Sequence, residues 1–481
     1  MERIIESLPE RDLSDLTRSV ARFVAALRFE DLGHEVVRIS RRCMLDGLAV
    51  MLAGSGQPGM EPLARHIQRI GGAPDARRVG DARTRFPAPL AALWNGTAGH
   101  AMDWDDTQLA EGAGRPYGLL MHPTVPPLAA LLALSDLVAR ERGRPVDGRE
   151  LLVAFNAGFE VACKIAEAIN PDHYMRGFHT SGTIGTFGSA TAAAKLLDLD
   201  EAATLQAIGI AASMAAGIRA NFGSMTKPLH VGLAAENGVT AALLAREGFS
   251  ANAEALDGKW GYFSVAGPGG EPSPIRDRLG RPFTMEHPGV SIKPYPSGVL
   301  THPSMDAMRL VMEENGLAPG DIESVTLRAG RNVLGPIRFQ IAGTALEGKF
   351  SFAFLLSAII LRGRAGKEEF TDGFVSSPEC QAMQRRVATE FDQVIEDMGW
   401  DRIRSRIDVR TRDGRDITRW ADENYRGGPH NPMPDAEIEA KFRNCAAGLL
   451  EEASIVRLFA AVWAIDEVKD VGELISLLSW R

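Results

Sequence analysis

Residues 150–169, ELLVAFNAGFEVACKIAEAI, carry apolar side chains at the three- and four-residue spacing of an α-helix. The same spacing recurs in PPLAALLALSDLVARERG (126–143) and in ENGVTAALLAREG (236–248). From about Leu13 to Ala266 the chain is rich in alanine, leucine and glycine. Glycines three residues apart in SGTIGTFGSATAAAKLL (181–197) permit close helix contacts, and their spacing does not fit a GxGxxG dinucleotide loop. This half of the chain therefore predicts a large all-α domain.

The pattern of apolar residues changes after the glycine- and proline-rich stretch GPGGEPSPIRDRLGRP at 267–282. Beyond it, IESVTLRAG (322–330) alternates like a strand, and RIDVRTRDGRDITRW (406–420) alternates around an Asp-Gly turn that is typical of a hairpin. Helical segments are interleaved. We therefore predict a mainly α protein with a helical domain over 1–282 and a smaller α+β domain over 283–430. C-terminal helices over 431–481, with Asp435 as an N-cap, are predicted to rejoin the helical domain.

Composition narrows the classes of partner. The 481 residues carry a formal net charge of −9, which argues against a nucleic-acid surface because such surfaces need clustered lysine and arginine. The four cysteines are scattered without a CxxC pair, which predicts neither disulfides nor a zinc site. The N-terminus lacks the apolar run of a signal peptide, and no window is apolar enough to span a membrane. We expect a cytoplasmic protein with no nucleic-acid or membrane partner.

Basic residues stand at the predicted starts of four helices: His122, His179, Lys227 and His302. Three of them precede a proline, which is favoured at the first helical position. Free backbone N–H groups and the helix dipole favour an anion there, so a basic side chain beside them makes a carboxylate-binding point. The same field disfavours an imidazolium and so favours a neutral histidine that can act as a base. The competing interpretation is that each is an ordinary surface or capping residue.

The stretch HAMDWDDTQ at 100–108 places ionisable groups directly after an apolar helix pattern. If it is helical, His100, Asp103 and Thr107 share one face with Asp106 beside them, while Asp105 points elsewhere. An aspartate there could orient a histidine or act as a base. Three alternatives stay open: a solvated acidic helix end, a Mg²⁺ site, and the DxDD motif of class II terpene cyclases. The absence of repeated Gln-Trp elements and the α+β domain argue against the cyclase.

Six stretches together closely resemble the MmgE/PrpD family, which includes 2-methylcitrate dehydratase, cis-aconitate decarboxylase and iminodisuccinate epimerase. They occur in the family's order along nearly the whole chain: NGTAGHAMDWDDT, HPTVPPLAALLAL, GFEVACKIAEAINPDHYMRGFHTSGTIGTFGSATAAAKLL, GSMTKPLHVGLAAENG, SIKPYPSGVLTHPSMDA and NPMPDAEIEAKFR. The resemblance implies that the smaller domain is a lid over the helical domain, with the active site between them. It also implies a homodimer.

The resemblance carries over six site positions, from the DxxxT, HP, FHT and TKPLH elements and from the lysine that opens the lid segment. They are Asp103, Thr107, His122, His179, Lys227 and Lys293. One position departs, because cis-aconitate decarboxylases have a catalytic histidine where KPYPSG places Ser297 and Gly298. That departure disfavours decarboxylation and leaves Tyr295 and Ser297 as local candidates for carrying a proton.

The expected function is that of a lyase or isomerase, without metal or organic cofactor, that removes a proton next to a carboxylate of a small di- or tricarboxylic acid. Dehydratase-type elimination is favoured; the alternatives are an epimerase of an iminodisuccinate-like acid and a non-catalytic acid-binding homologue. His179 and Asp103 are assigned to proton transfer, and Lys227, Lys293 and His122 to carboxylate binding. The further substrate contacts are expected from Thr107, Tyr295, Ser297, His100 and His302.

Overall fold

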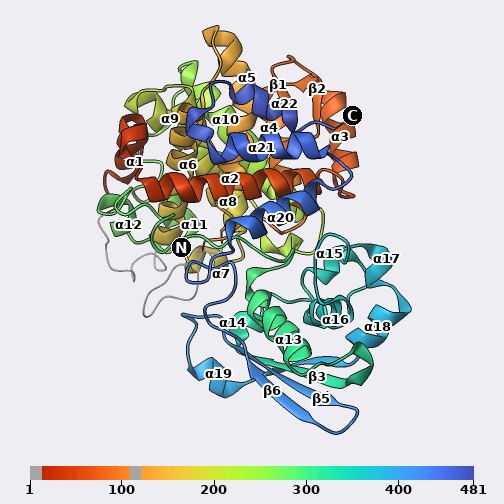
Figure 1. The fold of residues 1–481 in the computed structure, drawn as a ribbon. Coiled ribbons are helices and arrows are strands. Elements are labelled where there is room, and N and C mark those ends of the chain that lie inside the picture. The colour runs from red at the N-terminus through yellow and green to blue at the C-terminus, as the bar shows by residue number, and fades with distance from the viewer. Residues whose placement is uncertain (1–12, 109–120, 481) are drawn as a thin grey trace.

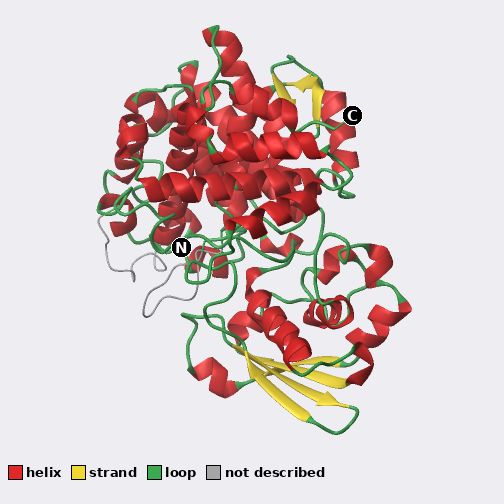
Figure 2. Ribbon diagram, in the orientation of Figure 1, coloured by secondary structure: helices red, strands yellow, loops and turns green. Residues whose placement is uncertain are grey.

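The computed structural model describes residues 13–108 and 121–480, and its helices gather mainly in one large body (Figures 1 and 2). None of the helices in this described part has the length and hydrophobicity of a membrane span. The helices of the large body are α1 (Leu16–Ala26), α2 (His34–Gly54), α3 (Met60–Ile70), α4 (Ala88–Ala101), α5 (Val125–Arg142), α6 (Gly148–Ile169), α7 (Asp172–Met175), α8 (Thr180–Leu196), α9 (Glu201–Met214), α10 (Thr226–Arg246), α11 (Tyr262–Ala266), α12 (Ser273–Arg276), α20 (Asp435–Ala446), α21 (Glu452–Trp463) and α22 (Val471–Leu477).

Helix α8 lies in the middle of this body, against α5, α6, α9 and α10. Its three spaced glycines each face a different neighbour. A Cβ at Gly182 would lie 2.8 Å from His230 Cβ, one at Gly185 would lie 2.9 Å from Pro126 Cγ, and one at Gly188 would lie 2.9 Å from Ala162 Cβ. Each distance is too short for a side chain, so the predicted role of these glycines in close helix packing is confirmed.

The helical half also contains a two-stranded antiparallel hairpin, β1 (Ala76–Arg78) and β2 (Asp81–Phe86), which the sequence did not predict. The stretch is rich in arginine and lacks a clear apolar alternation. Its anchor is tertiary: the indole of Trp94 in α4 donates to the carbonyl of Val79 at 2.9 Å. The expectation of a purely helical half was therefore wrong at this point.

The smaller body holds a four-stranded sheet in the order β4-β3-β5-β6. Strands β3 and β4 are parallel, whereas β5 pairs antiparallel with both β3 and β6. The predicted hairpin is confirmed, with Gly414 at φ 91° in its turn. Helices α13 and α16 pack against each other and against the sheet. The elements are α13 (His302–Glu314), β3 (Ile322–Ala329), α14 (Arg331–Leu334), α15 (Ala345–Gly348), α16 (Phe352–Arg362), α17 (Asp372–Val375), α18 (Pro378–Gln384), β4 (Val387–Phe391), α19 (Gln393–Asp397), β5 (Ser405–Thr411) and β6 (Asp416–Trp420).

The C-terminal helices lie on the large body, where α20 packs along α2 (Figure 1). An ion pair between Lys441 of α20 and Asp46 of α2 joins them at 2.5 Å, and both side chains are buried. Asp435 is the first residue of α20 and Pro434 precedes it as the N-cap, so the predicted cap was one residue too late. The domain boundaries at 282/283 and 430/431 stay a prediction.

Candidate functional site

The acidic stretch begins where α4 ends. The helix stops at Ala101, and Asp103 adopts a left-handed conformation with φ 54°. Aspartate is one of the few residues other than glycine that tolerate this region. The helix assumed for this stretch therefore ends at Ala101. Asp103 and Thr107 nevertheless line one cavity, as that assumption had predicted, whereas the expected direction of Asp105 is wrong. The turn instead directs the three carboxylates toward three different sets of partners.

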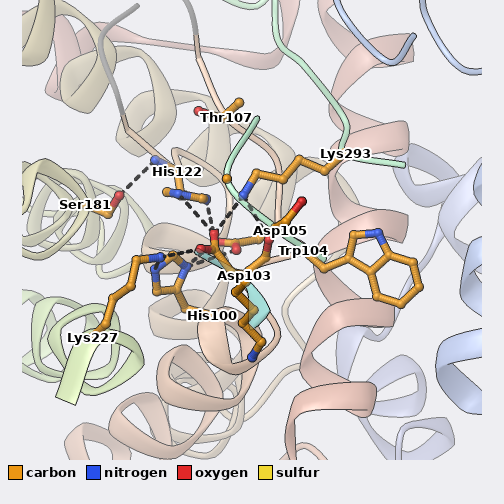
Figure 3. Close-up of polar contacts among 12 residues, drawn as sticks. His100, Asp103, Trp104, Asp105, Thr107, His122, Ser181, Lys227 and Lys293 are labelled. Atoms are coloured by element: carbon orange, nitrogen blue, oxygen red, sulfur yellow. Dashed lines mark hydrogen bonds and ion pairs between the residues drawn. The ribbon is translucent and has the colours of Figure 1, made fainter. Parts of the chain in front are cut away.

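Asp103 lies between two lysine ammonium groups (Figure 3). Lys227 Nζ is 2.9 Å from its Oδ2, and Lys293 Nζ is 2.8 Å from its Oδ1. Lys293 also donates to the backbone carbonyl of Asp103 at 2.9 Å. Burial opposes ionisation of this carboxyl, but the two lysines outweigh it and hold the pKa well below its usual range. Asp103 is therefore an ionised carboxylate that fixes both lysines in place.

Asp105 lies between two imidazoles, although the sequence placed it away from them. His100 Nδ1 is 2.9 Å from its carboxylate, and His122 Nδ1 is 3.2 Å from Oδ2 (Figure 3). Burial raises the carboxyl pKa, but the two histidines hold it well below its usual range. The expectation that Asp105 points elsewhere was wrong because the helix had already ended. Asp105 is placed to orient both rings and to stabilise a proton on either one.

His100 connects the two carboxylate clusters. Lys227 Nζ lies 2.8 Å from its Nε2, and a lysine ammonium can only donate. Nε2 therefore accepts, and the remaining proton sits on Nδ1 and points to Asp105. Burial lowers the His100 pKa to about 3, in keeping with this neutral tautomer.

Asp106 turns the other way and caps α5. Its carboxyl accepts from the Thr124 hydroxyl at 2.6 Å and from the Thr124 backbone N–H at 3.3 Å. Burial, with too little compensating positive charge, raises the Asp106 pKa to about 8. Asp106 is therefore a protonated structural group at neutral pH. Its partner is Thr124, whereas the sequence placed it beside His100, Asp103 and Thr107.

His179, at the start of α8, and His230, in α10, form a second pair of histidines. His179 is the N-cap residue of α8, and its Nδ1 lies 3.1 Å from Nδ1 of His230. One ring must donate and the other accept, so at least one is neutral. Burial, and then the charge of Lys227, hold the His179 pKa well below its usual range. His230 was missed from the sequence, although its position three residues after Lys227 on α10 would place both on one helix face.

A cavity of about 70 Å³ brings together all six positions carried over from the family resemblance. They meet there from distant parts of the chain. The described residues that line the cavity are Asp103, Thr107, His122, Tyr174, His179, Phe222, Lys227, Lys293, Gly298, Val299, Leu300, Pro336, Ile337 and Phe350.

Other predicted substrate contacts are not among these lining residues. The phenol of Tyr295 donates to Asp306 at 2.6 Å, and the hydroxyl of Ser297 lies 2.9 Å from that of Thr301. His302 Nε2 lies 3.2 Å from the carbonyl of Ser297. His100 is separated from the lining by Lys227, whose Nζ lies 2.8 Å from its Nε2. The neighbouring Gly298 does line the cavity, and a Cβ added there would meet nothing within 4 Å.

Two buried lysines beside the acidic turn were missed from the sequence. Lys349 donates to the carbonyl of Ala101 at 2.6 Å, and Lys441 donates to the carbonyl of Trp104 at 2.8 Å. Lys441 occurs in a helix of mixed polar and apolar residues, where a lysine is typical of a solvated face, and Lys349 directly follows a four-residue helix. No sequence signal distinguished them, because only the tertiary fold brings the helix end to them.

Four groups of the site could hold a metal ion: His100, Asp103, Asp105 and His122 offer ligand atoms within 4.8 Å of one another. Lysine and histidine nitrogens already lie against the oxygens of both carboxylates. A divalent cation would have to displace the two ammonium groups or bear their repulsion. The donor set therefore fits ammonium and imidazole partners better than a metal.

Comparison with known proteins matches both bodies of the chain. The MmgE/PrpD N-terminal domain matches residues 18–275, and the MmgE/PrpD C-terminal domain matches residues 295–465. The cis-aconitate decarboxylase of Mus musculus is 28% identical over 476 residues, covering 97% of this chain and 94% of the mouse protein. That of Homo sapiens is 28% identical, covering 97% and 95%, and that of Aspergillus terreus is 25% identical, covering 97% and 96%. The chain belongs to the MmgE/PrpD family.

Proposed function

We propose that this protein is a lyase that acts on a small di- or tricarboxylic acid without an organic cofactor or a metal. It removes a proton next to a carboxylate and, in the favoured reaction, eliminates water. The observation that carries the proposal is the cavity itself, where two ammonium groups and two imidazoles face the same small volume. The names of the relatives support a tricarboxylic acid as the kind of substrate.

Carboxylate binding is assigned to Lys227 and Lys293. Lys227 lies in the first turn of α10 and His179 caps α8, so backbone N–H groups of two helix ends add to the positive potential. Electron density that builds on a substrate carboxylate after proton loss would be stabilised by these preorganised donors. One such donor contributes about 3 to 4 kcal/mol to a transition state.

Proton transfer is assigned to His179 and His122. The neutral His179 takes the proton from the carbon beside the carboxylate. Burial lowers the pKa of His122, and Asp105, 3.2 Å from its Nδ1, opposes that shift. A proton held on His122 passes to the departing hydroxyl, so a C–H and a C–O bond break while a C=C bond and water form. From the sequence, Asp103 was predicted to belong to this set. Its two lysine contacts favour a role in holding those lysines instead.

Gly298 favours elimination over decarboxylation. The family resemblance implies a catalytic histidine near this position in cis-aconitate decarboxylases, and here the wall is a glycine with open space beside it. An epimerase remains the second candidate, because the same two histidines could remove and return a proton.

The test is to incubate a panel of di- and tricarboxylic acids with the protein in D₂O and to follow them by NMR. Loss of water with deuterium exchange at the neighbouring carbon supports the proposal. Inversion without elimination indicates the epimerase, and loss of CO₂ indicates a decarboxylase. Binding of citrate-like acids with no exchange indicates a non-catalytic homologue. EDTA should leave the activity unchanged; a loss that Mg²⁺ restores would assign the carboxylates to a metal.

We also infer a homodimer in the cytoplasm. The dimer rests on the family resemblance, and the cytoplasm on four cysteines that are all buried and unpaired. Sedimentation should give a particle of two 51.9 kDa chains. A mass of one chain at micromolar concentration would contradict the dimer.

A further inference from the structure

Three lysines from separate segments hold the backbone of the turn that carries Asp103. Lys349 donates to the carbonyl of Ala101 at 2.6 Å, Lys293 to that of Asp103 at 2.9 Å, and Lys441 to that of Trp104 at 2.8 Å. The carbonyls at the end of a helix have no partner within the helix, and the dipole makes this end negative. Ammonium groups are therefore suitable partners for it.

The three lysines do not come from the same body. Lys293 and Lys349 belong to the stretch 283–430, predicted as the lid domain, whereas Lys441 lies in α20 on the large body. Lys441 is also bound to Asp46 of α2, at 2.5 Å. Lys441 also donates to the carbonyl of Lys293 at 3.0 Å. If the lid moved relative to the helices, this contact and those of Lys293 and Lys349 with the turn would change, whereas the bond from Lys441 to Trp104 would stay.

Lys349 follows directly after α15 and is only 3% exposed. A buried ammonium is costly, and an apolar side chain would close this interface with a smaller penalty. The next residue, Phe350, lines the cavity, and its ring centre is 5.7 Å from Lys227 Nζ. Two adjacent residues of the lid thus make both contacts: Lys349 binds the end of α4, and Phe350 lies beside Lys227.

The cavity size implies that this contact is not permanent. Sites for small molecules usually measure about 300 Å³ or more, whereas this cavity measures about 70 Å³. Lid residues, among them Val299, Ile337 and Phe350, form part of its wall, so movement of the lid would widen it for a polycarboxylate. Movement of the lid would separate Lys349 from Ala101.

We propose that Lys349 is a positioning residue that couples lid closure to the geometry of Asp103. On closure its ammonium binds the end of α4 and, together with Lys293, holds the turn so that Asp103 lies between Lys227 and Lys293. This inference rests on the proposed function for its kinetic consequence. Its structural consequence, a turn held by the lid, can be measured without any substrate.

The test compares Lys349→Met with Lys367→Met. Lys367 serves as the control because it also comes from the lid and donates to a carbonyl of the large body, that of Cys445 at 3.4 Å, away from the turn. It is less buried than Lys349. In the substrate-free protein, Lys349→Met should speed hydrogen exchange of the Asp103 backbone amide, which donates to the backbone carbonyl of His100. With an active acid, Lys349→Met should lower kcat/KM about 10- to 100-fold, as loss of supporting contacts commonly does. Lys349→Arg should restore part of it, and Lys367→Met should match the unsubstituted protein.

Wild-type exchange and wild-type kcat/KM in Lys349→Met would overturn the inference. Equal effects of Lys349→Met and Lys367→Met would also overturn it, since they would indicate a general interface role. If no acid is turned over by any variant, the proposed function fails, while the exchange comparison still decides the role of Lys349. If the Met variant does not fold, Lys349→Gln replaces it, and exchange at the wild-type rate in that variant overturns the inference.

Discussion

The two walls of the cavity differ in chemistry. The helical body supplies an aspartate, two histidines and a lysine, at helix ends or in the turn after α4, together with a threonine, a tyrosine and a phenylalanine. The lid supplies apolar side chains, a glycine and a single lysine, Lys293. Reactive groups held at the ends of packed helices are preorganised, whereas an apolar lid excludes water and strengthens the electrostatic interactions beneath it. Under the proposed function, the helical wall would perform the chemistry and the smaller body would set its environment.

The largest effects are expected from the helical wall. Lys227→Met and His179→Gln should each lower kcat by about 10²- to 10⁴-fold, because each removes a charge-stabilising or proton-carrying group. Steady-state kinetics of the active acid measures the loss, and circular dichroism checks that the variants fold. Retained activity in both variants would remove the helical wall from the mechanism.

The neighbouring acids Asp105 and Asp106 form a matched pair on the same turn. Asp105→Asn removes the carboxylate that orients two imidazoles and should lower kcat about 10²-fold. Asp106→Asn replaces a carboxyl whose pKa is raised to about 8, and so already protonated at pH 7, with a neutral group of equal size. It should change kcat less than about threefold. Similar losses in both variants would show that the turn acts only through its fold.

The lid wall should be more tolerant. Phe350→Leu keeps an apolar surface beside Lys227 and should lower kcat/KM by about tenfold at most, since small changes in an apolar pocket have limited effects. Kinetics on the same acid measures it, with Lys367→Met as the control outside the cavity. A loss as large as that of His179→Gln would contradict the division between the two walls.

The pH dependence of stability tests the burial of His173, a histidine that does not line the cavity. Burial lowers the pKa of His173, which contacts Ala266 and Thr183 away from the cavity lining, to about 4. Between pH 6.5 and 4 the unfolded chain binds a proton at this residue and the folded protein does not. Stability from His173 is therefore present above pH 6.5 and falls by about 1.4 kcal/mol per pH unit as the pH decreases toward 4.

His173→Gln should flatten the pH dependence of the free energy of unfolding by about one proton in this range. Denaturant unfolding at several pH values measures the slope. The raised pKa of Asp106, about 8, acts in the opposite direction, because that carboxyl gains stability as the pH falls. An unchanged slope in His173→Gln would show that His173 is protonated in the folded protein.

The smallest effect is expected at Tyr295. Tyr295→Phe removes one hydrogen bond to Asp306 and should cost about 1 kcal/mol of stability. Because the phenol is bound within the lid, kcat should not change. A kcat loss above tenfold would return Tyr295 to the list of proton carriers.

Much of the fold could be predicted because its signals are local. Helical periodicity, the Asp413-Gly414 turn and the three glycines of α8 each report a requirement of their own segment. The basic residues at helix starts could also be predicted, since proline and a preceding basic side chain form a local pattern. The β1–β2 hairpin was not, because a bond from Trp94 secures it.

By itself, the sequence determined that the chain has a helical part and an α+β part, and which basic residues stand at the starts of its helices. Only the tertiary structure decided that Asp103, Thr107, His122, His179, Lys227 and Lys293 share one cavity. It also decided that Asp105 and Asp106 have opposite environments. The reason is physical. Helix and turn formation depend on neighbours in the chain, whereas burial, charge pairing and the partners of Lys349 and Lys441 depend on segments hundreds of residues away.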